Sequence, residues 1–246
     1  MAASGTSSKT PRTKASKVEH GSSVDSAFLR IRDLIVQGRM APGMWIVEGD
    51  LCEHLHLSRT PVRGALYLLQ REGYVIEHRN GAKARMVVAP LTKDDAFELY
   101  PLIARIEGLA GRRTTTLDEP VRAKLIEQLR AINEQLRTIA TQPETHNVGV
   151  FELDHEFHRL IVDAGSGQRL QTLHRAIEPQ TERYWRLYAS SITHQLSFSV
   201  KEHEAIIAAL EAADADRLEK ALRDNWEIGC ERLATVIDAF GERGSW

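Results

Sequence analysis

Apolar residues recur at helical spacing in three short stretches of the first third of the chain. They predict a first helix that ends near Gly38, a second that Asp50 caps, and a third from Ser58 to Gly73. The hydroxyl of Ser58 can accept a hydrogen bond from a free N–H group in the first turn of the third helix. Pro61 falls within that turn, where its missing N–H costs little. The third helix therefore has a well-defined start.

The pattern changes to that of a hairpin directly after the third helix. Strand-forming residues at 74–76 and 86–88 flank Asn80 and Gly81, a dipeptide typical of tight hairpin turns. Three helices followed by a two-stranded hairpin make up a winged helix-turn-helix domain. We assign this domain to residues 22–90.

Long amphipathic helices replace this pattern from residue 91 onward. They are expected at about 93–115, 118–141, 148–164, 169–190, 200–213 and 215–240. Such helices pack into a bundle with pockets between facing helices. The predicted fold class is therefore mainly α, with a winged helix-turn-helix domain followed by an all-helical bundle over residues 91–246.

Hydrogen-bond donors gather at the start of the third helix, opposite its apolar face. Arg59, Thr60 and Arg63 stand there, and an arginine fork suits guanine edges or phosphate oxygens. A helix N-terminus also attracts phosphate. More polar and cationic side chains flank the hairpin turn, where they can touch phosphate or the minor groove. These are His78, Arg79, Lys83 and Arg85. A solvated surface hairpin is the alternative explanation for this second group.

The charge is distributed unevenly along a chain whose net charge is −2. Residues 1–21 sum to +3, residues 22–90 to +2, and residues 91–246 to −7. The basic charge thus lies in the part expected to meet DNA, which favours binding to phosphate. The first 21 residues are rich in Ser, Thr and Lys without an apolar run, so we expect a disordered basic tail rather than a signal peptide.

The cysteines and the lengths of the apolar runs indicate a compartment. Cys52 and Cys230 are too few and too far apart for a disulfide framework, which favours a reducing cytosol. No apolar run approaches the roughly 20 residues that cross a bilayer. We therefore expect a cytoplasmic protein with no membrane partner.

Three side chains in the helical half have the chemistry of metal ligands. Asp154 and His158 are four residues apart on one predicted helix, so both project from the same face. His203 lies on another helix among apolar residues. A carboxylate and two imidazoles suit zinc, nickel or manganese. A surface pair and a core histidine are the alternatives at this point.

The first half resembles the GntR family of bacterial winged-helix regulators, whose motif reads close to S-R-T-P-V-R-E-A-L with L-x-x-E-G after it. The matching stretches here are Ser58-Arg59-Thr60-Pro61-Val62-Arg63-Gly64-Ala65-Leu66 and Leu69-Gln70-Arg71-Glu72-Gly73. The resemblance implies that the start of this helix, with Arg59, Thr60 and Arg63, contacts DNA, and that Gly81 lets the wing approach DNA closely. Gly64 replaces the usual glutamate, and a glycine inside a helix costs about 1 kcal/mol relative to alanine.

The second half resembles the helical effector domain of the FadR subfamily, known as the FCD domain. The matching residues are Leu153 to Leu160, Glu202-His203 with Ala209-Leu210, and Asp214 with Ala221-Leu222. The resemblance implies an effector-binding and dimerisation domain with a divalent metal ion. Its ligands would be Asp154, His158, His203 and one more histidine on the final helix. Asn225 stands at that fourth position, and its amide oxygen is a weaker ligand than imidazole.

The resemblance also places a cation near an acidic effector. The family often has an arginine where this chain has Ile103, so another cation must take its role if the effector is acidic. Arg105 and Arg183 are the candidates.

These observations predict a ligand-responsive transcription regulator rather than an enzyme. We expect a repressor that binds a pseudo-palindromic operator as a homodimer and is released by a small carboxylate or sugar acid. Two alternatives stay open. One is a metal-dependent enzyme that uses Asp154, His158 and His203 around a bound water, and the other is a nonspecific architectural DNA binder.

Overall fold

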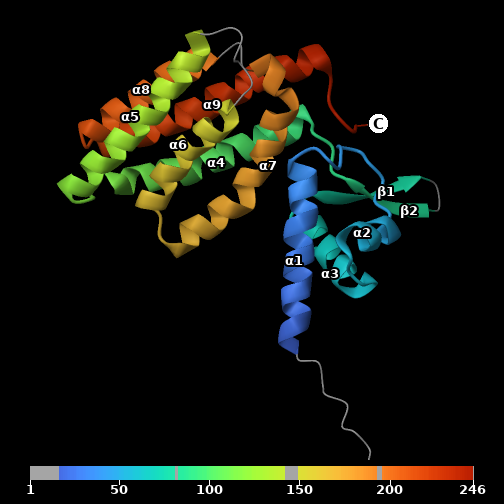
Figure 1. Ribbon diagram of the computed structural model, residues 1–246. Helices are drawn as coiled ribbons and strands as arrows, with labels where there is room; N and C mark the ends of the chain where they lie inside the picture. Colours follow the sequence, from blue (N-terminus) through green and yellow to red (C-terminus); the bar gives the residue numbers. More distant parts are fainter. Residues whose placement is uncertain (1–16, 81–82, 142–148, 193–195, 246) are drawn as a thin grey trace, which may run out of the picture.

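The computed structural model describes residues 17–80, 83–141, 149–192 and 196–245. Its N-terminal part contains α1 (Lys17–Val36), α2 (Glu48–Leu55), α3 (Arg59–Arg71), β1 (Val75–Asn80) and β2 (Lys83–Val88). The helices that follow are α4 (Lys93–Thr114), α5 (Glu119–Thr141), α6 (Val150–Gly165), α7 (Gln168–Ile192), α8 (Leu196–Glu211) and α9 (Ala215–Phe240). Figure 1 shows a small N-terminal unit beside a larger helical bundle. The predicted mainly helical fold, three helices with a β-hairpin wing and then a helical bundle, is confirmed.

The core of the N-terminal unit lies where the apolar faces of α1 and α3 meet. Ile31 of α1 and Leu66 and Leu69 of α3 are fully buried there. β1 and β2 pair antiparallel from Val75 opposite Val88 to the turn. The wing hairpin is thus joined to the helices through the same core.

A third extended segment, residues 43–46, pairs with β2, and the sequence pattern did not predict this pairing. The N–H of Ile46 donates to the carbonyl of Met86 at 2.9 Å, and the N–H of Val88 donates to the carbonyl of Met44 at 2.9 Å. Hydrophobic spacing alone does not reveal a single bridge such as that between Trp45 and Val87.

Several predicted boundaries and caps need correction. α1 begins at Lys17, inside the segment expected to be a disordered tail, whose residues 1–16 lie outside the described ranges. Asp50 lies in the first turn of α2 instead of capping it, because the helix begins at Glu48. Ser58 does occupy the N-cap position of α3, but its side chain makes no capping hydrogen bond. α8 begins at Leu196, four residues earlier than the predicted start.

Gly64 allows α1 and α3 to pack closely. A Cβ atom at this position would lie 3.1 Å from both γ-carbons of Val24 in α1. Such a contact is tighter than ordinary packing, so the missing side chain lets the two helices approach each other. The glycine that weakens the intrinsic stability of α3 therefore also improves its packing against α1.

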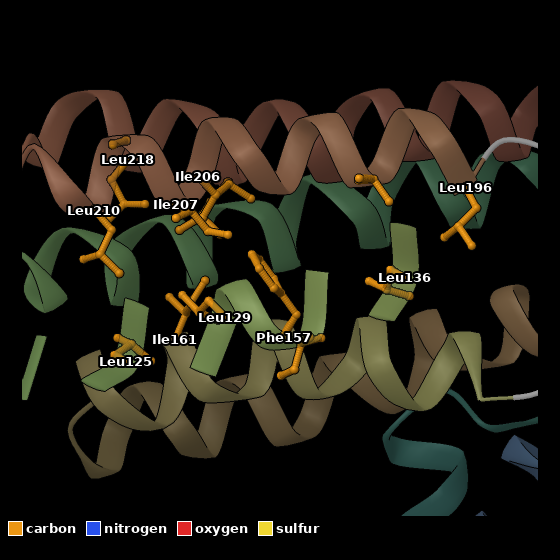
Figure 2. Close-up of a cluster of buried hydrophobic side chains, with 14 of the residues drawn as sticks. Leu125, Leu129, Leu136, Phe157, Ile161, Leu196, Ile206, Ile207, Leu210 and Leu218 are labelled. Carbon is orange, nitrogen blue, oxygen red and sulfur yellow. The ribbon is translucent and has the colours of Figure 1, made fainter. Parts of the chain in front are cut away.

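The core of the bundle is formed by apolar side chains from α5, α6, α8 and α9. Figure 2 shows them interleaved between the facing helices. The fully buried members are Leu129, Leu136, Phe157, Ile161, Ile206, Ala209, Leu210, Leu218 and Leu222. α4 packs lengthwise against α9 and also contacts α6 and α7. No helix in the described part of the chain is long and apolar enough to cross a membrane.

The two halves are joined by residues 89–92 and by α7. Figure 1 shows α7 at the junction, beside α1. The hydroxyl of Tyr184 in α7 donates to Asp95 at 2.6 Å and accepts from the backbone N–H of Thr92 at 3.2 Å. Leu91 pairs with Arg243 near the C-terminus through two backbone hydrogen bonds. The linker, residues 89–92, is therefore held against the bundle by Tyr184 of α7 and by the backbone of Arg243.

A close backbone contact brings α6 against α4. Gly165, at the end of α6, is buried against the carbonyl group of Ala110 in α4, and a Cβ atom there would overlap with it. Since the obstacle is backbone, it cannot move aside by rotating a side chain. This contact sets how near α6, which carries Asp154 and His158, lies to α4.

We expect Gly165→Ala to lower the free energy of unfolding by about 1–3 kcal/mol, because overpacking forces the backbones apart. Gly167→Ala is the matched control, because Gly167 is exposed and a Cβ atom there would meet nothing within 4 Å. Urea unfolding of both variants measures the difference. Equal stability of Gly165→Ala and the control would contradict the close contact between α4 and α6.

Candidate functional site

The start of α3 presents the predicted donors to solvent. Ser58, Arg59 and Thr60 are exposed, and so is the side chain of Arg63, to 65%. The other face of the helix is buried in the core, with Val62, Ala65, Leu66 and Leu69 on it. The amphipathic pattern thus separates the donors from the core, as the sequence predicts.

Glu48 of α2 orients Arg63, and sequence reasoning missed this contact. The Nε of Arg63 donates to Oε2 of Glu48 at 2.7 Å. No other partner of Arg63 is seen among the described residues, so the two terminal amino groups of its fork remain available. A guanidinium held through Nε can still offer a bidentate pair to a guanine edge.

The wing carries further cations near α3. Arg79 is 77% exposed and pairs with Glu77 at 3.2 Å. The guanidinium of Arg85 lies 5.2 Å from the ring centre of Trp45, which sequence reasoning had not singled out. Lys83 stands opposite Asn80 in the hairpin, but its side chain and the whole of Gly81 lie outside the described residues.

The structure brings the three predicted metal ligands together. Asp154 and His158 of α6 and His203 of α8 place one ligand atom each within 4.8 Å of one another. Nε2 of His203 lies 3.5 Å from Oδ1 of Asp154. Both histidines are buried, whereas Asp154 is partly exposed. A divalent ion fits this set of a carboxylate and two imidazoles.

The hydrogen bonds of His203 fix its tautomer. Nδ2 of Asn133 donates to the carbonyl of Val200 at 3.1 Å, so the amide oxygen of Asn133 faces His203 and lies 3.2 Å from its Nδ1. Nδ1 must then carry the proton, which leaves a lone pair on Nε2. Nε2 is buried and has no hydrogen-bond partner. An unpaired buried acceptor aimed at two other ligands supports metal binding.

Burial and the neighbouring His158 lower the pKa of His203. The imidazole is therefore neutral at physiological pH, which is the form that binds a metal. Phe157 stacks on the ring, with centroids 3.8 Å apart and planes 7° apart. The ring is thus held in one orientation by stacking on its face and by the hydrogen bond of Nδ1 to Asn133.

Glu107 of α4 is the main residue of the site that sequence reasoning missed. It is fully buried and accepts hydrogen bonds from Nδ1 of His158 at 2.6 Å, Nε1 of Trp226 at 2.8 Å and Nε2 of His174 at 3.0 Å. Because Glu107 takes Nδ1 of His158, Nε2 of that ring is left for a metal. The signal was present in the sequence as a carboxylate on the apolar face of a helix.

The pKa values of Glu107 and His158 are shifted by their contact. Burial alone raises the pKa of Glu107, but His158 and His174 outweigh it and hold the pKa well below its usual range. Burial alone lowers the pKa of His158, but the carboxylates of Glu107 and Asp154 raise it to about 9. Without a metal, His158 is therefore protonated at neutral pH.

A cavity lies beside these ligands, with lining residues from α4, α6, α7, α8 and α9. Its volume is about 90 Å³, and it opens to solvent beside Asp154 and His158. Its aromatic lining consists of Tyr100, Phe151, Trp185 and Trp226, and its ionisable lining includes Arg232, His155, Glu178 and Glu182. The lining thus has apolar walls and charged groups of both signs.

Asn225 lies in this lining, where the resemblance expects a fourth ligand. Its Nδ2 donates to Oε2 of Glu202 at 2.8 Å, and the same oxygen accepts from Arg232 at 3.0 Å. The amide nitrogen is thereby committed to Glu202, so the amide oxygen is the atom that remains for a ligand. An amide oxygen binds zinc more weakly than imidazole does.

Arg105 and Arg183, the two arginines expected to hold the effector, are not among the residues that line the cavity. Arg105 is about half exposed and lies 3.7 Å from Glu227. Arg183 is buried at the junction of the two halves and donates to the carbonyl of Ala89 at 2.6 Å. Arg232 replaces them as a cation of the cavity.

Two family models match the chain. The model described as bacterial regulatory proteins of the gntR family matches residues 24–83. The model described as the FCD domain matches residues 98–227, which is more than half of the chain. The first match covers the winged helix-turn-helix unit, and the second covers the bundle from α4 into α9.

The curated relatives are transcription regulators rather than enzymes. A probable D-xylose utilization operon transcriptional repressor of Paenarthrobacter nicotinovorans is 30% identical over 198 residues, covering 78% of this chain and 82% of the relative. The gluconate operon transcriptional repressor of Bacillus subtilis is 26% identical over 204 residues, covering 81% of this chain and 79% of the relative. The similarity extends through both halves.

Solved structures share this fold. The protein McbR/YncC of E. coli aligns with a TM-score of 0.64 at 16% identity, covering 89% of this chain and 99% of that one. A putative GntR transcriptional regulator of Rhodococcus sp. RHA1 aligns with a TM-score of 0.63 at 21% identity and with the same coverage. At these identities the likeness shows the fold alone.

We expect Asn133→Leu to weaken zinc binding by about 10- to 100-fold, because the tautomer of His203 is no longer fixed. His203→Ala should abolish measurable binding at this site. His54→Ala, at an exposed histidine of α2, is the control. Isothermal titration with zinc measures all three variants, after circular dichroism has shown that they are folded. An Asn133→Leu protein with wild-type affinity would contradict the assigned orientation of His203.

We also expect the zinc affinity to rise with pH until about 9, by up to about tenfold per unit, because the metal must displace one proton from His158. Glu107→Gln removes a charge that raises the pKa of His158, so the zinc affinity of this variant should level off at a lower pH than that of the wild type. Titrations against a competing chelator between pH 6 and 9.5 measure the profile. The same profile in both proteins would show that Glu107 does not control His158.

Proposed function

The chain is a DNA-binding transcription regulator of the GntR family with a C-terminal FCD domain, and we propose that it is a repressor released by a small carboxylate or sugar acid. One observation carries this proposal. The chain that exposes helix α3 also holds a cavity in its bundle, with a cluster of candidate metal ligands beside it. A DNA-reading surface and a small-molecule site in one chain are the two parts that a ligand-responsive regulator requires.

The DNA contacts of the proposal come from α3 and the wing. Ser58, Arg59, Thr60 and Arg63 surround the exposed start of α3, where side chains can reach base edges in the major groove. Backbone contacts would come from the wing, with Arg79, Lys83 and the close approach of Gly81. A protein with these contacts acts in the cytoplasm, where the bacterial chromosome lies.

A homodimer follows from the small number of base contacts in one winged helix, since two copies on a pseudo-palindromic operator double them. The surface of α4 supports such a contact. Leu102 and Leu109 are two helical turns apart on one face of α4, and each is 51% exposed. Burying these side chains against a second copy would remove apolar surface from water.

The effector site of the proposal is the cavity beside Asp154, His158 and His203. These three side chains, with the amide oxygen of Asn225, would hold a divalent zinc, nickel or manganese ion, which supplies positive charge for a carboxylate. Arg232 adds a cation to the lining. The carboxylates of Glu178 and Glu182 could accept hydrogen bonds from the hydroxyl groups of a sugar acid. The relatives named for gluconate and D-xylose operons favour this class of effector.

We expect Arg63→Ala to weaken binding to the operator by about 5- to 150-fold, the range that one bidentate contact to a base provides. Arg71→Ala is the matched control, because Arg71 is an exposed arginine at the other end of the same helix. The operator is first located by mobility shifts on the upstream region of the gene. Fluorescence anisotropy then gives the affinities in the presence of competitor DNA. An unchanged affinity of Arg63→Ala would contradict the role assigned to the start of α3.

A further inference from the structure

α7 has one face toward the cavity and another toward the DNA-binding unit. His174, Glu178 and Thr181 line the cavity. Gln180 and Arg183, on the other face, bind backbone carbonyl groups outside the bundle. One helix therefore contacts both the cavity and the unit that reads DNA.

Gln180 binds the end of the recognition helix. Its side chain is 6% exposed, and its Nε2 donates to the carbonyl of Glu72 at 2.6 Å. Glu72 is the C-cap residue of α3. Carbonyl groups at the end of a helix lack a partner within the helix, so a donor from α7 satisfies one that would otherwise need water.

Arg183 fixes the orientation of Gln180. Its Nη1 donates to Oε1 of Gln180 at 3.2 Å, so the amino group of the amide must face Glu72. Its Nη2 donates to the carbonyl of Ala89 in the linker. Arg183 is 4% exposed, and no carboxylate forms an ion pair with it in the described part of the chain. Burying a guanidinium without such a partner is unfavourable, so its hydrogen bonds to Gln180 and Ala89 are needed to offset the cost.

The other face of α7 reaches the metal ligands through Glu107. Nε2 of His174 binds one carboxylate oxygen of Glu107, and Nδ1 of His158 binds the other. His174 precedes Gln180 by six residues on the same helix. A continuous series of contacts thus runs from His158 through Glu107 and α7 to the end of α3.

We propose that Gln180 and Arg183 are positioning residues that transmit metal binding in the bundle to the recognition helix. This proposal rests on the proposed function, because it assigns the route by which the ligand site affects DNA binding. An ion that fixes His158 also fixes Glu107, and thereby His174 and α7. The motion of α7 is thereby reduced. Gln180 and Arg183 then hold the end of α3 and the linker against this less mobile helix.

Hydrogen exchange of the full chain, with and without zinc, tests this proposal. The reporters are the amides of residues 72–74 and 89, whose hydrogen bonds close the end of α3 and tie it to the linker. In the wild type, zinc should slow their exchange by about five- to tenfold, the factor that corresponds to one hydrogen bond of ordinary net strength. In Gln180→Ala, the zinc effect on these amides should vanish while the zinc affinity stays at its wild-type value.

Arg175→Ala is the matched control, because Arg175 is an exposed arginine of α7. It should respond to zinc as the wild type does. If Gln180→Ala does not fold, Gln180→Met keeps the length of the side chain and removes only its hydrogen bonds.

Two results would overturn the proposal. One is a wild type in which zinc leaves residues 72–74 unchanged, and the other is a glutamine variant in which zinc protects them as in the wild type. Operator titrations run in parallel separate this inference from the function itself. A wild type without a specific operator contradicts the proposed function, whereas the exchange data still decide the role of Gln180.

Discussion

The buried carboxylate of Glu107 is the interaction on which the site depends. An ionised group without water needs several hydrogen bonds to remain stable. Here they come from His158 of α6, His174 of α7 and Trp226 of α9, so one group of α4 holds three other helices in place. The same contact leaves Nε2 of His158 as the ring atom that a metal ion would bind. The carboxylate of Glu107 therefore determines both how these helices pack and how the ring of His158 is oriented.

The close packing of α4 and α6 at Gly165 and the core around Phe157 support this arrangement. Phe157 belongs to that core and also stacks on His203, so the imidazole ring rests against the packed core of the bundle. The open side of the ligand cluster faces the cavity, where α7 contributes part of the wall. The helix that forms this wall also contacts the linker and the end of α3. The cavity thus lies one helix away from the DNA-reading unit.

Much of the fold could be predicted from hydrophobic spacing, since α3, α5, α6 and α9 have boundaries within about two residues of those expected. The proximity of Asp154, His158 and His203 could also be predicted, because i, i+4 spacing and a family motif both point to it. The roles of Glu107, Asn133 and Glu48 could not be predicted, because each binds a side chain far away in the sequence. Arg183 was misjudged for a related reason, since a buried arginine that binds backbone carbonyl groups leaves no pattern in the sequence.

The most direct test of the central claim is the operator affinity of the zinc-loaded protein across a panel of small carboxylates and sugar acids. Fluorescence anisotropy of wild type and His203→Ala, side by side, provides the comparison. We predict that at least one acid weakens operator binding of the wild type and has no effect on His203→Ala, whose recognition helix is intact. An acid that acts equally on both proteins would show that the effector binds elsewhere. No response to any acid in the panel would contradict release by this class of ligand.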